Sequence, residues 1–125
     1  MPYYVYIVTN KGNTVVYTGV TNNIHRRLFE HRVGCAPNPF AWRYQCWKLV
    51  HFEEFQSIKE AIKKESRLKN WLRVWKDELI EKENPKWLDL SKGWNYEGWF
   101  DPKRPPPGFY TQNRSEEWGG PEDQK

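Results

Sequence analysis

Five side chains in the first 65 residues combine a proton-moving group, two cations and a carboxylate in one short span. Tyr6 and Tyr17 carry phenols, whose pKa of about 10 nearby cations would have to lower before a phenol could take a proton from water. Arg27 could bind a phosphate oxygen through its guanidinium, and His31 could hold a phenol or a leaving oxygen. Glu65 offers a carboxylate, and one carboxylate with waters and substrate phosphate commonly holds magnesium. The set predicts hydrolysis of a phosphodiester bond.

Each of these residues also has a structural explanation. Glu65 falls in the apolar stripe of a predicted helix, where an ionised carboxylate is costly unless a cation or a donor meets it. That cation is either a metal or a basic side chain; the candidates for a salt bridge are Arg67, Lys69 and Arg27. Tyr6 and Tyr17, taken singly, could be strand aromatics that only pack. His31 could be an ordinary surface histidine near a helix end.

Two strands and a turn must position the tyrosines. Residues 3–9 (YYVYIVT) and 15–21 (VVYTGVT) are aromatic and β-branched, and residues 10–13 favour a turn. If residues 11 and 12 form the turn, Tyr6 lies directly opposite Tyr17 on the same face of the hairpin. A loop of another length would change this register. Gly19 either lets a phosphate approach the strand or marks a bulge.

A helix must follow the hairpin to bring the cations to it. Asn22 or Asn23 can cap this helix, which extends to about residue 32, with Ile24 and Leu28 facing the core. Residues 27 and 31 are one turn apart on the adjacent stripe, at the rim of the core. Residues 33–46 are expected to form an ordered aromatic loop, and residues 48–55 a third strand.

Two further helices are predicted. Ser57 and Glu60 form a capping box that opens a helix to about residue 70. Its buried stripe is expected to hold Ile58, Ala61, Ile62, Leu68 and Leu72, with Glu65 among them. The last helix spans residues 75–83 and stops at Asn84-Pro85. Trp87, Leu88 and Leu90 are then expected to dock the end of the domain.

The elements predict an α+β fold, a three-stranded antiparallel sheet flanked by helices, in one domain over residues 1–93. Residues 94–125 are rich in Pro, Gly and acids and are expected to be an irregular, partly disordered tail, of which Trp94 and other aromatics could fold back. No apolar run is long enough for a membrane span and no signal peptide is visible, so a cytoplasmic protein is expected. Cys35 and Cys46 match no metal or redox spacing and are expected as reduced thiols.

The charge is concentrated in the predicted domain. Residues 1–93 hold 16 Lys+Arg and 10 Asp+Glu, a surplus of +6, whereas residues 94–125 hold 4 and 6. A basic body favours a polyanionic partner, although many proteins with such a surplus bind none. The basic residues expected to contact nucleic acid are Arg26, Arg32, Arg43, Lys63, Lys69 and Arg73.

The order of these motifs resembles that of GIY-YIG nuclease domains. Val5-Tyr6-Ile7 and Tyr17-Thr18-Gly19 match the two name motifs, and residues 23–31 (NIHRRLFEH) match the helix after them. Residues 60–71 (EAIKKESRLKNW) and 75–87 resemble the small single-domain branch of that superfamily. The resemblance covers about residues 2–90. It implies that Tyr6, Tyr17, Arg27, His31 and Glu65 are the catalytic residues, with Glu65 the metal ligand.

Several positions depart from the family pattern. Tyr4 replaces the first glycine of the first motif and Thr18 the middle residue of the second, and both changes leave the tyrosines intact. Val20 stands where repair-type members have a lysine. Asn84 matches only loosely a late asparagine of some family sites.

The resemblance implies an endonuclease that uses one magnesium or manganese ion on Glu65 and acts on nucleic acid, with DNA favoured over RNA. In this reading Tyr17 accepts the proton of the attacking water and Tyr6 positions that water. The first alternative is a nucleic-acid-binding module that does not cut, with Trp71 or Trp75 stacking on bases. The second is a protein-interaction domain that docks through the tail.

Overall fold

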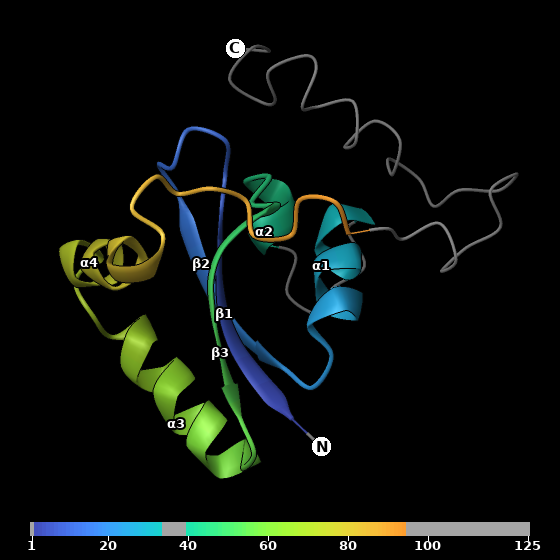
Figure 1. Cartoon of the computed structure of the whole chain (residues 1–125), viewed down its shortest axis with the longest axis vertical. Helices are drawn as coiled ribbons and strands as arrows, with labels where there is room; N and C mark the ends of the chain where they lie inside the picture. The colour runs from blue at the N-terminus through green and yellow to red at the C-terminus, as the bar shows by residue number, and fades with distance from the viewer. Residues whose placement is uncertain (1, 34–39, 95–125) are drawn as a thin grey trace, which may run out of the picture.

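The computed structural model describes residues 2–33 and 40–94 as one three-stranded sheet between two helical layers. Its strands are β1 (Tyr3–Thr9), β2 (Val16–Thr21) and β3 (Lys48–Phe55). Its helices are α1 (Ile24–Val33), the short α2 (Phe40–Arg43), α3 (Ile58–Lys69) and α4 (Arg73–Glu83). The predicted α+β class and the antiparallel sheet are confirmed (Figure 1).

The sheet has the order β2-β1-β3, so the first strand of the hairpin is central. The predicted register was wrong: Thr9 pairs with Val16 and Tyr6 with Gly19, two residues further along β2 than expected. The cause is a longer loop, in which the side chain of Asn10 accepts hydrogen bonds from the backbone N–H groups of Thr14 and Val15. Because the shift is an even number of residues, both tyrosines still lie on one face of the sheet.

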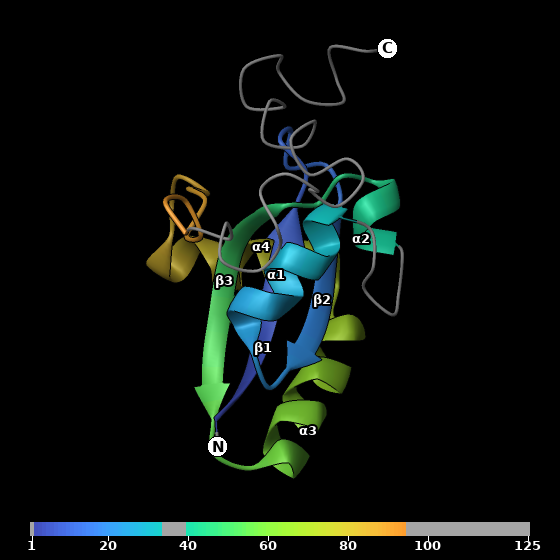
Figure 2. The ribbon, with the colours of Figure 1, turned by 90° about the vertical axis from the view of Figure 1, so that its right-hand side faces the viewer.

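The two faces of the sheet bury different helices. The face that holds Tyr6 and Val8 packs against α1 and α2, through Ile24, Leu28 and Ala41. The face that holds Val5 and Ile7 packs against α3 and α4, through Ala61, Leu68 and Ile80. Figures 1 and 2 show α1 and α2 on one side of the strands and α3 and α4 on the other. A sheet covered on both faces explains why β1 is apolar on both.

Local capping sets the helix starts. The side chain of Asn23 accepts from the backbone N–H of Arg26 at 3.0 Å, which selects Asn23 rather than Asn22 as the cap of α1. Ser57 caps α3 by accepting from the N–H of Glu60 at 3.4 Å. α4 begins two residues earlier than predicted, directly after a turn at residues 70–72.

The buried stripe of α3 differs from the predicted one. Ala61 and Leu68 are fully buried, but Ile58, Ile62 and Leu72 are about half exposed or more. The side that faces the sheet is therefore centred on Ala61, Leu68 and residues 64–65 between them. Glu65 keeps its place in this stripe, with a side chain that is 17% exposed. The predictions for Ala61 and Leu68 are confirmed, whereas those for Ile58, Ile62 and Leu72 are wrong because the helix meets the sheet through Ala61 and Leu68.

Residues 84–94 run from the end of α4 past β3 to the α1 side of the sheet (Figure 1). Trp87 is buried as predicted, whereas Leu88 and Leu90 are exposed. Trp94 packs on the core beside His25, with ring centroids 4.0 Å apart.

The structure describes one of the two cysteines and does not describe the C-terminal residues. Cys46 is a buried free thiol, and burial raises its pKa to about 12, while Cys35 lies outside the described residues. The expectations for residues 95–125 also lie outside them. Among the described residues, no helix is long and apolar enough to cross a membrane.

Candidate active site

The side chain of Tyr6 is fully buried at the centre of the candidate site. Its ring occupies the space beside Gly19, where a β-carbon would stand 2.5 Å from Cζ and 2.8 Å from Cε2 of the ring. Any side chain at position 19 would therefore displace the phenol. This role of Gly19 is neither of the two considered from the sequence, because it concerns a contact between two strands.

The hydroxyl of Tyr6 joins two of the candidate residues. Its oxygen lies 2.7 Å from Nε2 of His31, and the guanidinium of Arg27 donates a hydrogen bond to it. Burial raises the pKa of Tyr6, and the charges of Tyr17 and Glu65 raise it further, while Arg27 opposes them. Arg27 therefore lowers the pKa of Tyr6 in the expected direction, but desolvation outweighs the one guanidinium.

His31 is 1% exposed, so it is not the surface histidine that the sequence allowed. It lies one turn beyond Leu28 on the inner side of α1, against both tyrosine rings. Burial, and to a lesser extent the positive charge of Arg27, lower its pKa to about 4. The imidazole is therefore neutral at physiological pH, and it shares one hydrogen-bonded proton with the phenol of Tyr6.

Tyr17 is the accessible phenol of the pair. It is the diagonal neighbour of Tyr6, with ring centroids 6.4 Å apart, and it is only partly buried. Its ring also contacts His31 edge-on at 5.5 Å and stacks on Phe40 at 5.7 Å. Phe40 was not singled out in the sequence, although the aromatic composition of its loop was a signal for such packing.

Arg27 lies at the edge of this cluster, with a side chain that is 20% exposed. Its Nε donates to Glu30 at 2.9 Å, and Arg26 approaches the other oxygen of the same carboxylate at 3.8 Å. Glu30 therefore fixes the orientation of the guanidinium while its other end reaches the hydroxyl of Tyr6.

Glu65 comes to the site from the opposite face of the sheet. α3 contacts both β1 and β2, and β2 is an edge strand. Lys69 pairs with Glu65 at 3.0 Å, and its Nζ lies 6.0 Å from the ring centroid of Tyr17. The charge of Glu65 also reaches Tyr6. Tyr6, Tyr17, Arg27 and His31 thus form one cluster, and Glu65 approaches its edge from the other face of the sheet, paired with Lys69.

Comparison with known proteins places this arrangement in a family. A family model described as the GIY-YIG catalytic domain matches residues 2–84, two thirds of the chain. The chain belongs to the GIY-YIG family.

The similar proteins carry a family designation rather than an activity. The UPF0213 protein of Syntrophus aciditrophicus is 39% identical over 82 residues, which are 66% of this chain and 92% of that protein. The UPF0213 protein of Clostridium perfringens is 37% identical over 89 residues, 71% of this chain and 94% of that protein. The solution NMR structure of a UPF0213 protein from Bacillus halodurans is 27% identical, covers 76% of this chain and 99% of that chain, and has a TM-score of 0.47.

The donor set of this GIY-YIG domain fits one hard cation better than a protein-made cage. The described residues contain no group of three or more His, Cys, Asp and Glu that could hold a metal. Structural zinc sites need four such ligands. Magnesium is commonly held by one or two carboxylates with waters and substrate phosphates. Glu65 meets that lesser requirement, provided that Lys69 yields its place on the carboxylate.

Of the six basic residues expected to contact nucleic acid, four are exposed and available, whereas Arg32 and Arg73 are engaged in contacts within the protein. Arg26, Arg43 and Lys63 are exposed, and Lys69 is 49% exposed beside Tyr17. Arg32, by contrast, is 11% exposed and lies 3.9 Å from Asp89. Its position beneath the segment that crosses β3 gives it a structural role, which its sequence context did not distinguish.

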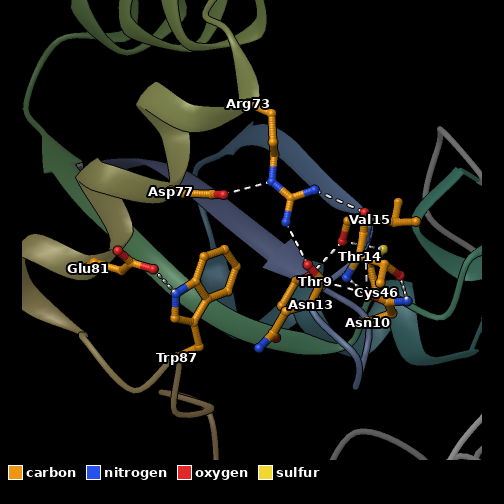
Figure 3. A network of polar contacts seen from close by, with 10 residues as sticks. All are labelled: Thr9, Asn10, Asn13, Thr14, Val15, Cys46, Arg73, Asp77, Glu81 and Trp87. Carbon is orange, nitrogen blue, oxygen red and sulfur yellow. Dashed lines mark hydrogen bonds and ion pairs between the residues drawn. The ribbon is translucent and has the colours of Figure 1, made fainter.

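Arg73 fixes the hairpin loop of the GIY-YIG domain to α4 (Figure 3). Its guanidinium donates to the carbonyl oxygens of Asn13 at 2.6 Å and Thr14 at 2.9 Å, and to Asp77 at 2.7 Å. These bonds occupy donors that a phosphate would need. Asn13 has a positive φ of 58°, so its carbonyl is presented by a left-handed turn residue.

Asn84 is buried at the far side of the sheet from this site. Its amide donates to the carbonyl oxygens of Val50 and Leu88 and accepts from the N–H of Leu88. Val50 lies on β3, the strand at the other edge from Tyr17. The geometry gives Asn84 a structural role at the end of α4 and keeps it out of the candidate site.

Proposed function

We propose that this GIY-YIG domain is a metal-dependent endonuclease that hydrolyses phosphodiester bonds in nucleic acid, with DNA preferred to RNA. The observation that carries the proposal is the buried pair of Tyr6 and His31 beside Tyr17 and Arg27, with Glu65 linked to the ring of Tyr17 through Lys69. Family membership supports a nuclease-type domain. The basic charge of residues 1–93 supports a polyanionic substrate.

Tyr17 is proposed to accept the proton of the attacking water. It is the partly exposed phenol, so a water can reach it, whereas Tyr6 is fully buried. Arg27 is proposed to bind a non-bridging phosphate oxygen and to stabilise the charge that develops there, because its guanidinium stands at the rim of the site, 20% exposed.

Tyr6 and His31 are proposed to position other groups rather than to touch the water. The hydroxyl of Tyr6 accepts a hydrogen bond from Arg27 and is hydrogen-bonded to neutral His31. Tyr6 and His31 together therefore hold the guanidinium of Arg27 in position. This changes the role expected from the sequence, in which Tyr6 positioned the water. The phenol of Tyr6 is fully buried and already has two hydrogen-bond partners, so it cannot also bind the attacking water.

Glu65 is proposed to hold one magnesium or manganese ion. When bound, such an ion polarises the phosphate and stabilises the leaving oxygen. Before that, Lys69 neutralises the carboxylate in its half-buried position, which avoids an unpaired buried charge. In the substrate complex, the freed ammonium remains within reach of the phosphate beside Tyr17.

The test compares the parent protein with Glu65→Gln on supercoiled plasmid, on single-stranded DNA and on RNA. Each is incubated with magnesium, with manganese or with chelator. We expect the parent to cut DNA only with a metal, and Glu65→Gln to lose more than about a hundredfold of the rate, as single catalytic groups often do. Glu78→Gln, an exposed carboxylate on α4, is the matched control and should cut normally.

Two outcomes would contradict the proposal. A folded Glu65→Gln protein that cuts as fast as its parent would remove the metal ligand from the mechanism. Parent protein that binds DNA but cuts neither DNA nor RNA with either metal would support the alternative of a binding module. In that case the pair of Glu65 and Lys69 is a structural salt bridge.

A further inference from the structure

A cluster of three basic residues lies beside the candidate site on its α3–α4 side. Lys69 ends α3, Arg73 begins α4, and Lys76 is one turn further along α4. The turn at residues 70–72 brings the two helix ends together, with the N–H groups of residues 75 and 76 donating to the carbonyl of Leu72. Three positive charges are thus gathered where the chain passes from one helix to the next.

Lys76 is the member of this cluster whose charge is not balanced. It is half-buried, and among the described residues it makes no ion pair. Lys69 is paired with Glu65, and Arg73 is paired with Asp77. The first turn of α4 contains no acidic residue that could serve instead. Burial lowers the pKa of Lys76, and the charges of Arg73 and Lys69 lower it further.

The mutual repulsion of the positive charges of Lys69, Arg73 and Lys76 is unfavourable in the free protein. It is relieved when an anion binds between them. The direction in which that anion lies follows from Lys69, whose Nζ stands 6.0 Å from the ring of Tyr17. Arg27 stands on the other side of the same edge strand, on α1. The edge of β2 therefore has positive charge on both sides of the accessible phenol.

We propose that Lys69 and Lys76 form a second phosphate subsite, which binds the backbone phosphate next to the scissile one. The nucleic acid strand then crosses the edge of β2 from α1 toward the turn between α3 and α4. Arg73 contributes a fixed positive charge to the subsite while its hydrogen bonds hold the hairpin loop. This inference rests on the proposed function, since it assumes a phosphodiester chain at Tyr17.

The experiment measures binding in chelator, where no cutting interferes. Fluorescence anisotropy with a labelled DNA duplex gives the affinity of the full chain at several salt concentrations. For Lys76→Gln we expect a several-fold loss of affinity and a salt slope that is smaller by about 0.9, the value for one lost phosphate contact on duplex DNA. Lys76→Arg, which keeps the charge, should restore both.

Lys82→Gln is the matched control, because Lys82 is an exposed lysine on the same helix, in its last turn. Equal effects of Lys76→Gln and Lys82→Gln would overturn the subsite, because general attraction would then explain both. No binding by the parent at low salt would overturn the subsite and the proposed function together. A specific loss in Lys76→Gln, with a parent that never cuts, would uphold the subsite and contradict only the nuclease.

Discussion

The phenol of Tyr6 fills the space that a side chain at position 19 of the neighbouring strand would need. Tyr6 and Gly19 are directly paired across β1 and β2, so the glycine is required by the tyrosine rather than by its own backbone. Gly19 of the second motif thus makes room for the aromatic ring of Tyr6 in the first motif.

Gly19→Ala is therefore expected to destabilise the protein. The new methyl group would stand 2.5 Å from Cζ of a fully buried ring, and overpacking of this kind costs about 1–3 kcal/mol. Urea denaturation measures the loss. The control is the same change in a Tyr6→Ala background, where the clash is absent and the added loss should vanish. An equal loss in both backgrounds would show that the ring is not the cause.

The neutral state of His31 predicts a pH dependence of stability. Its pKa in the folded protein is about 4, below the ordinary value of 6.5, so the unfolded chain binds a proton that the folded protein does not. The stabilising contribution is complete above pH 6.5 and is lost as the pH falls toward 4, at up to about 1.4 kcal/mol per pH unit.

Urea denaturation of the parent and of His31→Gln between pH 7.5 and 4 tests this. His25 and His51 are present in both proteins, so their titration cancels in the difference. We expect the stability advantage of the parent over the variant to shrink as the pH falls. An advantage that stays constant over this range would mean that His31 titrates normally in the folded state.

Arg73 is expected to stabilise the hairpin loop through its fork of hydrogen bonds. Arg73→Lys keeps the charge but cannot donate to two carbonyls and a carboxylate at once, so we expect a loss of about 1–2 kcal/mol. Faster hydrogen exchange at the amides of residues 13–15 should accompany it. Arg67→Lys, an exposed arginine on α3, is the control and should change neither quantity.

Asn84 is expected to matter for folding and not for chemistry. Asn84→Ala removes an amide that makes three hydrogen bonds to backbone groups of Val50 and Leu88, the one to Val50 buried, at a cost of about 2–4 kcal/mol. If the protein cuts DNA as proposed, the rate per folded molecule should stay within about twofold of the parent. A rate that falls far more than the folded fraction would show that Asn84 belongs to the active site after all.

Most of the fold could be predicted because local patterns and tertiary packing agree. Strands β1 and β3 have the predicted bounds, and α3 begins after its predicted cap at Ser57. The hairpin register could not be predicted, because the side chain of Asn10 organises a longer loop, and sequence does not show which turn former will do so.

The buried residues of α3 were harder to predict than its length. Ala61 and Leu68 were predicted correctly, but Ile58 and Ile62 are exposed, since the small side chain of Ala61 is the one that lets the helix lie close to β1. The partners of Arg32 and Arg73 could not be predicted from the sequence either. Their partners, Asp89 and the carbonyls of residues 13 and 14, lie more than fifty residues away along the chain.

The segment after α4 caps polar backbone groups of β3. The N–H of Leu90 donates to the carbonyl of Leu49, and the side chain of Asp89 accepts from the N–H of Leu49. The amide of Asn84 donates to the carbonyl of Val50. The match to the family model ends at residue 84. A fragment trimmed to that boundary would leave strand groups bare and prone to pair with other chains. We therefore expect the smallest stably folded fragment to extend past the end of the family match, to include Asp89 and Leu90.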